Sequence, residues 1–253
     1  DVGIDVNDME LVFRETSFVT GVHQVHGGSG DPSPFTAFGA MQGLLATLHA
    51  CYGNEDVGKY RYAVQGAGHV GMEFIKLLRE HDAKVYVTDI NKELVQRAVD
   101  EYGCTAVGLD EIYDTDAEVY SPCALGGTVN EQTLKRLKCK VICGAANNQL
   151  ANNEIGDEVS RRGIFYAPDY AVNAGGVMNI SLEIDGYNRE RAMRMMRTIY
   201  HNVSRIFEIA KRDGIPTYLA ADRLAEERIS TIGKLRLPHL GVSAPSFQGR
   251  RGS

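Results

Sequence analysis

The fold of this chain is decided by the stretch Tyr60-Arg61-Tyr62-Ala63-Val64-Gln65-Gly66-Ala67-Gly68-His69-Val70-Gly71. It predicts a short strand, a tight glycine turn and the start of an amphipathic helix. Gly66 would allow the sharp turn out of the strand, Gly68 would let the backbone approach a pyrophosphate, and Gly71 would let the helix pack closely. Free N–H groups at the start of that helix would attract the phosphates of a dinucleotide.

The second half of a dinucleotide fingerprint follows this turn. Residues 84–88 predict another strand, which ends at Asp89, 18 residues beyond Gly71. A carboxylate there can accept hydrogen bonds from both ribose hydroxyls of an adenosine, and it would repel the additional phosphate of NADP. The residues that come next, Ile90-Asn91-Lys92, include no arginine. A glycine turn without a ligand is the alternative, but the two halves together predict NAD.

The composition is that of an ordinary globular protein. Of 253 residues 43% are hydrophobic and 24% are charged, which is enough for a sizeable core in one large or two modest domains. A net charge of −6 argues against nucleic acid or an anionic membrane as the main partner. No apolar run approaches the roughly 20 residues that span a bilayer, and no signal-peptide pattern opens the sequence.

The cysteines favour a reducing compartment. Five of them are scattered along the chain, an odd number, and none forms a CxxC pair. We therefore expect buried free thiols in a cytoplasmic protein, and no metal site. These residues are Cys51, Cys104, Cys123, Cys139 and Cys143.

The first part of the chain leads into the region of the glycine turn. Residues 1–15 are acidic with a few apolar side chains, and because no Met precedes them we expect a processed chain or part of a longer parent. Residues 20–34 are rich in glycine, serine and proline, which is typical of a linker. They run directly into an apolar helix that starts near Thr36, with Ser33 as a plausible N-cap and Pro34 in the first turn. We therefore expect an ordered hinge.

From residue 60 onward, predicted strands and helices alternate, which indicates a Rossmann-type, doubly wound and mostly parallel sheet. Ligands bind such sheets at the carboxyl ends of the strands, so we expect the loops after Gln65, Asp89, Ser121, Gly144 and Tyr166 to face one crevice. The predicted strands cover 60–65, 84–88, 105–107, 117–121, 140–144 and 164–166, and the helices cover 70–80, 91–102, 130–137 and 152–162.

After Asn188 the pattern becomes helical. Apolar residues recur at spacings of three and four up to Ala210, which predicts one long helix with a core-facing stripe that ends near Gly214. A second helix is expected over 217–232, with Ala220, Leu224, Ala225, Arg228 and Ile229 on one side. Residues 241–253 have no pattern, so we expect a disordered tail. The stripe of the first helix consists of Met193, Met196, Ile199, Val203, Ile206 and Ala210.

Eight ordered stretches together resemble the glutamate/leucine/phenylalanine/valine dehydrogenase family, and most closely its leucine-specific members. They cover nearly everything from Asp1 to Leu235, which leaves little room for coincidence. The stretches are Gly27–Pro34, Gly66–Gly71, Val87–Lys92, Tyr120–Gly126, Ala145–Leu150, Tyr166–Val177, Gly186–Arg191 and Ala220–Arg228.

The resemblance implies reversible oxidative deamination of an L-amino acid to a 2-oxo acid and ammonia, with NAD taking the hydride. It implies that Thr36 and Asn147 lie near the nicotinamide carboxamide, and that Asn173 lies between nicotinamide and substrate. Short hydroxyl and amide groups can orient the ring without adding charge near the hydride. The implied cofactor-binding residues are Thr36, Gly66, Ala67, Gly68, His69, Val70, Asp89, Ile90, Cys123, Ala124, Leu125, Ala145, Asn147 and Asn173.

The resemblance also implies a substrate pocket formed by Asn173, Val177 and Ile180. Two branched aliphatic side chains suit leucine, valine or isoleucine, and they offer no partner for the carboxylate of a glutamate side chain. Phenylalanine or tryptophan stays open, because one or two residues can change the specificity of such a pocket. A non-catalytic module that senses NAD is a further alternative from a different class of protein.

One part of the family pattern has no match. Relatives carry a preceding domain with a substrate-binding and a catalytic lysine, and no lysine of this chain lies in such a segment, while the catalytic aspartate matches Asp1. We therefore expect the cofactor-binding part of a homo-oligomeric enzyme, inactive alone. The expected divisions are 1–34 as a remnant of the substrate domain and hinge, 35–187 as the NAD-binding domain, 188–240 as helices returning toward the substrate domain, and 241–253 as tail.

Overall fold

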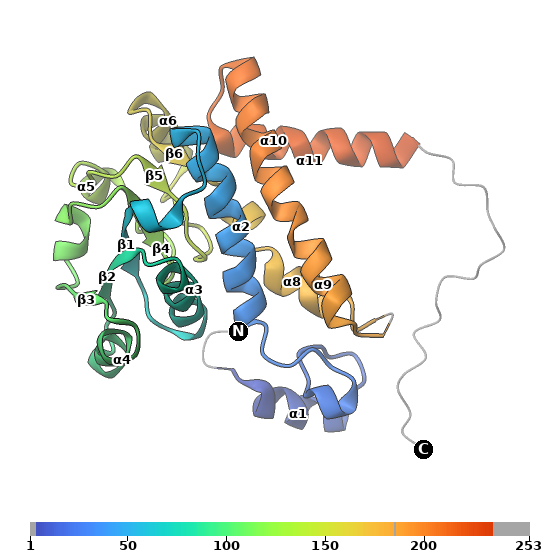
Figure 1. Cartoon of the computed structure of the whole chain (residues 1–253). Coiled ribbons are helices and arrows are strands. Elements are labelled where there is room, and N and C mark those ends of the chain that lie inside the picture. Colours follow the sequence, from blue (N-terminus) through green and yellow to red (C-terminus); the bar gives the residue numbers. More distant parts are fainter. Residues whose placement is uncertain (1–3, 185, 235–253) are drawn as a thin grey trace.

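A six-stranded sheet forms the left part of the structure in Figure 1, a computed structural model that describes residues 4–184 and 186–234. All neighbouring strands are parallel, in the order β3-β2-β1-β4-β5-β6. This is the strand order of Rossmann-type folds, and the predicted fold class is therefore confirmed. The strands are β1 (Arg61–Gln65), β2 (Lys84–Thr88), β3 (Thr105–Ala106), β4 (Val119–Pro122), β5 (Val141–Ile142) and β6 (Phe165–Tyr166).

Both faces of the sheet are covered by helices. Successive residues of a strand point to opposite faces, so each face contributes apolar side chains to its own core cluster. In β1, Tyr62 and Val64 join one core cluster, while Ala63 between them joins another. The first face is covered by α2 (Ser33–Tyr52), α3 (His69–Glu80) and α4 (Lys92–Tyr102). The second is covered by a short 3-10 helix (Glu111–Asp114), α5 (Glu131–Leu134) and α6 (Asn153–Arg161).

The helix α2 contacts several other helices as well as the sheet. Eleven of its residues are buried, and it packs against α3, α8 (Gly175–Ser181) and α10 (Thr198–Asp213). Its start differs from the prediction: Pro32 occupies the N-cap position and Ser33 lies inside the helix, so the expected Ser33 cap is wrong. The reason is local, because the backbone N–H of Ser33 already donates to the Asp31 carboxylate at 2.8 Å.

An additional helix, α1 (Val6–Glu15), precedes this region and lies at the bottom of Figure 1. It begins with a reciprocal capping box between Asp5 and Asp8, and none of its residues is buried. A 3-10 turn (Gln24–His26) and an ordered loop then lead to α2. Whether residues 1–34 act as a hinge stays a prediction.

The C-terminal third is helical, as expected, but it is divided differently. The segment after Tyr166, expected as a loop, contains α7 (Asp169–Val172) and leads into α8 (Gly175–Ser181). The single helix predicted after 188 is two helices, α9 (Arg189–Met196) and α10 (Thr198–Asp213). The Thr198 hydroxyl donates to the Met195 carbonyl at 2.6 Å, a side-chain bond of the kind that competes with a regular helix.

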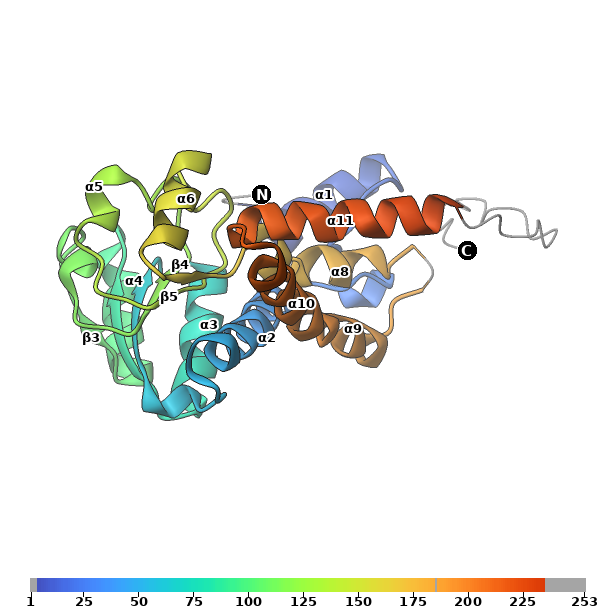
Figure 2. The ribbon, with the colours of Figure 1, turned by 90° about the horizontal axis from the view of Figure 1, so that it is seen from above.

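The apolar stripe of α9 and α10 is confirmed as core, since Met196, Ile199, Val203 and Ile206 are buried. The last helix, α11 (Thr217–Lys234), extends away from the sheet (Figures 1 and 2). Of its predicted side, Ala220 is buried and Leu224 is half-buried, whereas Ala225, Arg228 and Ile229 are exposed. The expected tail, 241–253, lies outside the described residues. No helix among the described residues is long and apolar enough to cross a membrane.

All five cysteines are unpaired thiols. Cys104, Cys139 and Cys143 are buried, while Cys51 and Cys123 are partly exposed.

Candidate cofactor and substrate site

The glycine turn after β1 is pressed against the loop that follows β4. Gly66 adopts a positive φ of 108°, and a Cβ atom there would lie 2.7 Å from the backbone nitrogen of Ala124. The backbone N–H of Cys123 in turn donates to the Gln65 carbonyl at 2.7 Å. Only glycine fits at position 66, for conformational and steric reasons together.

The helix α3 starts directly after this turn and leaves its first N–H groups without a side-chain cap. A Cβ atom on Gly68 would meet no described atom within 4 Å, whereas one on Gly71 would lie 2.1 Å from the Gly66 carbonyl oxygen. The turn and packing roles predicted for the glycines are therefore matched. Ala67 is buried, and His69 and Val70 form the first turn of α3, where His69 is exposed.

Asp89 joins this turn to the loop that follows β2. Its Oδ2 accepts from the Ala67 N–H at 2.7 Å and its Oδ1 from the Asn91 N–H at 2.8 Å. The carboxylate is thus held beside the glycine turn, at the carboxyl end of β2. The side chain of Ile90 stands next to it, 85% exposed.

Asn147 and Asn173 meet in the half of the sheet formed by β4, β5 and β6. The Asn173 Nδ2 donates to the Asn147 Oδ1 at 2.5 Å and to the Ala145 carbonyl at 3.3 Å. Asn173 comes from the end of α7 and the other two residues from the loop after β5, so the bond joins segments that are 26 residues apart. The predicted pair of amides is therefore brought together, with free capacity on the Asn147 Nδ2.

The starts of α2 and α8 cross at glycines. A Cβ on Gly175 would lie 2.3 Å from the Phe35 carbonyl, and one on Gly176 would lie 2.5 Å from the Thr36 Oγ1. This close approach brings Thr36 next to α8, the helix that carries Val177 and Ile180. Val177 is 68% exposed and Ile180 is partly exposed, so both apolar side chains are accessible.

The loop after β4 adds an uncharged wall. Burial raises the pKa of the Cys123 thiol to about 11, against a small opposing effect of the Ala145 backbone N–H, so the thiol stays protonated near neutral pH. Ala124 and Leu125 follow it and are exposed. A series of contacts thus runs from Asp89, through the glycine turn and the loops after β4 and β5, to Asn173, and Thr36 lies beside the start of α8. Asp1, the predicted catalytic residue, lies outside the described residues.

Sequence reasoning gave no role to Gln149, which organises the loop of Asn147. Its side chain is fully buried, and its Nε2 donates to the carbonyls of Gly144 at 2.7 Å and Ala146 at 3.0 Å. Its backbone N–H donates to the Asp169 carboxylate at 2.9 Å, which ties the loop to α7. No periodicity or motif distinguishes such a glutamine from a polar loop residue.

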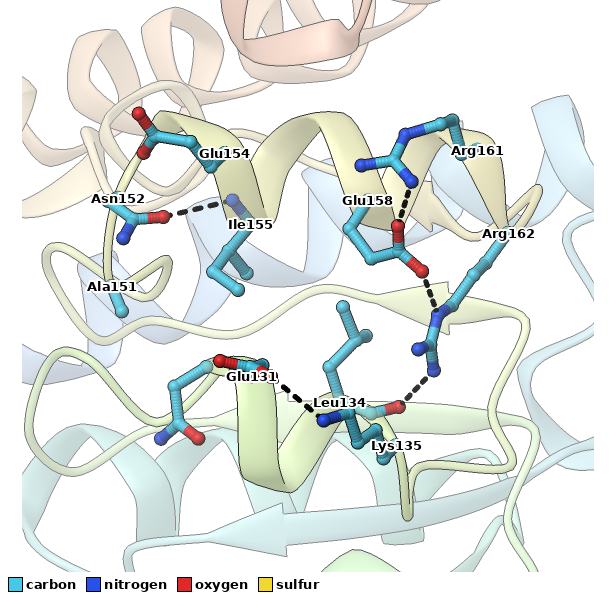
Figure 3. Close-up of a pocket in the computed structure, with 11 residues that line it drawn as sticks. Glu131, Leu134, Lys135, Ala151, Asn152, Glu154, Ile155, Glu158, Arg161 and Arg162 are labelled. Carbon is cyan, nitrogen blue, oxygen red and sulfur yellow. Dashed lines mark hydrogen bonds and ion pairs between the residues drawn. The ribbon is translucent and has the colours of Figure 1, made fainter.

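The predicted residues line neither of two hollows on the surface. One of about 560 Å³ lies between α5 and α6 (Figure 3). Its cations have partners, since Arg161 and Arg162 pair with Glu158, and Arg162 also donates to the Leu134 carbonyl. Another of about 550 Å³ lies between α2, α6 and α10. Neither is lined by a predicted residue, so the candidate site remains the edge described above.

Comparison with known proteins identifies the relatives of this arrangement. The sequence profile of the family described as Glutamate/Leucine/Phenylalanine/Valine dehydrogenase matches residues 87–236, more than half of the chain. The leucine dehydrogenase of Thermoactinomyces intermedius is 51% identical over 236 residues, which cover 93% of this chain. The chain spans 64% of the length of that relative.

Solved structures agree on the fold. The L-tryptophan dehydrogenase from Nostoc punctiforme superposes with a TM-score of 0.78 at 39% identity, over 79% of this chain and 61% of that one. The hetero-hexameric glutamate dehydrogenase from Thermus thermophilus, in its Leu-bound form, superposes with a TM-score of 0.76 at 22% identity. It covers 94% of this chain and 64% of that one, and at this identity it shows the fold alone.

Proposed function

Since the chain belongs to the Glutamate/Leucine/Phenylalanine/Valine dehydrogenase family, we propose that it binds the cofactor of an NAD-dependent amino-acid dehydrogenase. The reaction is the oxidative deamination of a branched-chain L-amino acid to its 2-oxo acid and ammonia. The observation that carries most weight is the hydrogen bond between Asn173 and Asn147. It connects the loop after β5 to the end of α7, two residues before α8, the helix that carries Val177 and Ile180.

The glycine turn fits a dinucleotide. A Cβ atom built on Gly68 would have no described atom within 4 Å, so the space beside this backbone is open. A pyrophosphate can approach there, where any side chain would intrude. Uncapped N–H groups at the start of α3 supply donors and partial positive charge. Asp89 is positioned to accept from the adenosine ribose, and the exposed Ile90 can cover the adenine.

The remaining residues would orient the reacting groups. Bound NAD would supply the hydride acceptor. Asn147, whose Oδ1 is occupied by Asn173, keeps its Nδ2 to donate to the carboxamide oxygen, and Thr36 can fix the carboxamide from the α2 side. Asn173 would hydrogen-bond the substrate amino group. The protonated Cys123 adds no charge beside the migrating hydride.

Val177 and Ile180 would contact the substrate side chain, and branched aliphatic surfaces suit leucine, valine or isoleucine. The leucine dehydrogenase relative supports this choice. An aromatic substrate remains the alternative, supported by the L-tryptophan dehydrogenase that superposes on this chain. We further propose a homo-oligomer that works in the cytoplasm. The unpaired thiols support the compartment.

The chain by itself should bind NADH without measurable turnover. The residues proposed to bind the cofactor all lie within the described part of the chain. No lysine in that part hydrogen-bonds to Asn147 or Asn173, where water would be activated and the substrate carboxylate held. A titration of NADH fluorescence and an absorbance assay with NAD and L-leucine would measure binding and turnover. The protein expressed from its complete reading frame serves as comparison and should be active. A turnover of about 1 per second or more by the chain alone would contradict this expectation.

Replacing Asp89 with asparagine should weaken NADH binding about tenfold, close to 1.4 kcal/mol, because the charged acceptor for the ribose is lost. Binding of NADPH should weaken less or improve, since the repulsion of its phosphate is removed. Fluorescence titrations with both nucleotides measure this change. Asp100→Asn, an exposed change on α4, is the matched control. Equal affinities of D89N and the unmodified chain for both nucleotides would exclude the proposed role.

A further inference from the structure

A buried carboxylate joins the end of α8, the helix that carries Val177 and Ile180, to the glycine-rich loop before α2. The residue is Glu183, two positions beyond α8, and only 6% of it is exposed. Its Oε1 accepts from the backbone N–H of Gly21 at 3.0 Å and from that of Ser29 at 2.9 Å. The Ser29 hydroxyl donates to the same oxygen at 2.5 Å.

The contact matches hydrogen-bond donors to a carboxylate oxygen. All three partners donate, and a carboxylate only accepts, so donors and acceptor match. A hydroxyl–carboxylate distance of 2.5 Å is within the range of charge-assisted bonds, which are about twice as strong as neutral ones. Burial of an unsatisfied carboxylate would be costly, so the loop and the carboxylate hold each other in place.

The contact fixes one end of α8, while glycines fix the other. At the start of α8, Gly175 and Gly176 touch Phe35 and Thr36 of α2. Beyond its end, Glu183 holds Ser29, which lies only four residues before the first residue of α2. The helix, the loop and the start of α2 therefore form a closed ring of contacts. Within this ring α8 cannot tilt without breaking a contact to the segment that carries Thr36.

We propose that Glu183 is a positioning residue that sets the orientation of α8, and with it the distance between the aliphatic pocket and the nicotinamide site. The inference rests on the proposed function. Glu183 itself reaches neither ligand. Its loss lets α8 shift, which moves Val177 and Ile180 away from the substrate, while the glycine turn, which takes no part in these contacts, stays intact.

The first test measures the contact directly. In Glu183→Met the hydrogen exchange of the Gly21 and Ser29 amides should accelerate about tenfold or more, since both lose their acceptor. Glu183→Gln keeps the shape and one accepting oxygen, so its exchange should lie between that of E183M and the unmodified protein. Glu190→Gln, an exposed change on α9, and Ser181→Ala, on the exposed side of α8, are the matched controls.

The second test separates positioning from general stability, with protein expressed from its complete reading frame. E183M should raise the KM for L-leucine about tenfold, with the Kd for NADH unchanged within twofold, and E183Q should restore part of the loss. Parallel loss of leucine and NADH affinity, or no change in either, would overturn the proposal. An unmodified protein without dehydrogenase activity would refute the proposed function itself, and the positioning role with it.

Discussion

Alanine at position 71 should lower the free energy of unfolding by about 3 kcal/mol and abolish NADH binding at the concentrations that saturate the unmodified chain. The new Cβ would lie 2.1 Å from the backbone oxygen of Gly66 and 2.9 Å from its carbonyl carbon. A backbone carbonyl cannot rotate away like the end of a flexible side chain, so α3 must move off the turn. Urea unfolding followed by circular dichroism measures the stability, and NADH fluorescence measures the binding.

Gly68→Ala separates the two effects in the same turn. Its Cβ meets no described atom within 4 Å, and the residue already has an ordinary negative φ of −65°, so the fold should lose less than about 1 kcal/mol. NADH affinity should nevertheless fall, because the methyl group occupies the approach of the pyrophosphate. If G71A were as stable as G68A, the turn would not restrict the size of residue 71, and this prediction would be contradicted.

Glutamate at position 149 should have the second large effect, a loss of about 3 to 5 kcal/mol at neutral pH. The Gln149 Nε2 donates to two carbonyl oxygens in a fully buried position, and a carboxylate would place negative charge against both. The loop from Gly144 onward would then reorganise, and Asn147 would lose its place opposite Asn173. Thermal unfolding and NADH titration of Gln149→Glu would measure both losses.

The stability of Q149E should also depend on pH in a defined direction. Burial beside two carbonyls favours the protonated acid, so the folded-state pKa of the introduced carboxyl group lies above its unfolded value. Protonation therefore stabilises the folded variant below the unfolded pKa, and this stabilisation is lost as the pH rises through the folded value. The variant should be less destabilised near pH 4.5 than near pH 8. Gln132→Glu, at an exposed position on α5, should show no such dependence.

Most of the sheet could be predicted because its signals are local. A glycine turn, strand-forming residues and helix caps all lie within a few residues of the elements that they define, and the strand 84–88 has the predicted bounds. Short strands such as β3, β5 and β6 are bounded less well, since pairing with neighbours limits each to two residues. The helix α1 had a local signal too, the Asp5–Asp8 capping box, which the sequence analysis did not use.

The supports of the site could not be predicted in the same way. Glu183 and its partner Ser29 are 154 residues apart, and only the folded chain shows that they meet. Gln149 has near neighbours as partners, but its burial depends on the packing of α7 and of the loop after β4. The break at Arg197, in the helix predicted after Asn188, could not be predicted either. The apolar spacing continues across it and gives no sign of a break.

The position of α2 in the sequence has a consequence for biosynthesis. This helix is completed before any strand of the sheet is made, yet it is packed on one side by the sheet and on another by α10, which ends at Asp213. Growing chains emerge from the ribosome amino end first. The apolar surface of α2 therefore stays uncovered until about 160 further residues have been made, which takes roughly 10 to 30 seconds at common elongation rates. Nascent chains stopped before α10 should accordingly be good substrates for chaperones that bind exposed apolar helices.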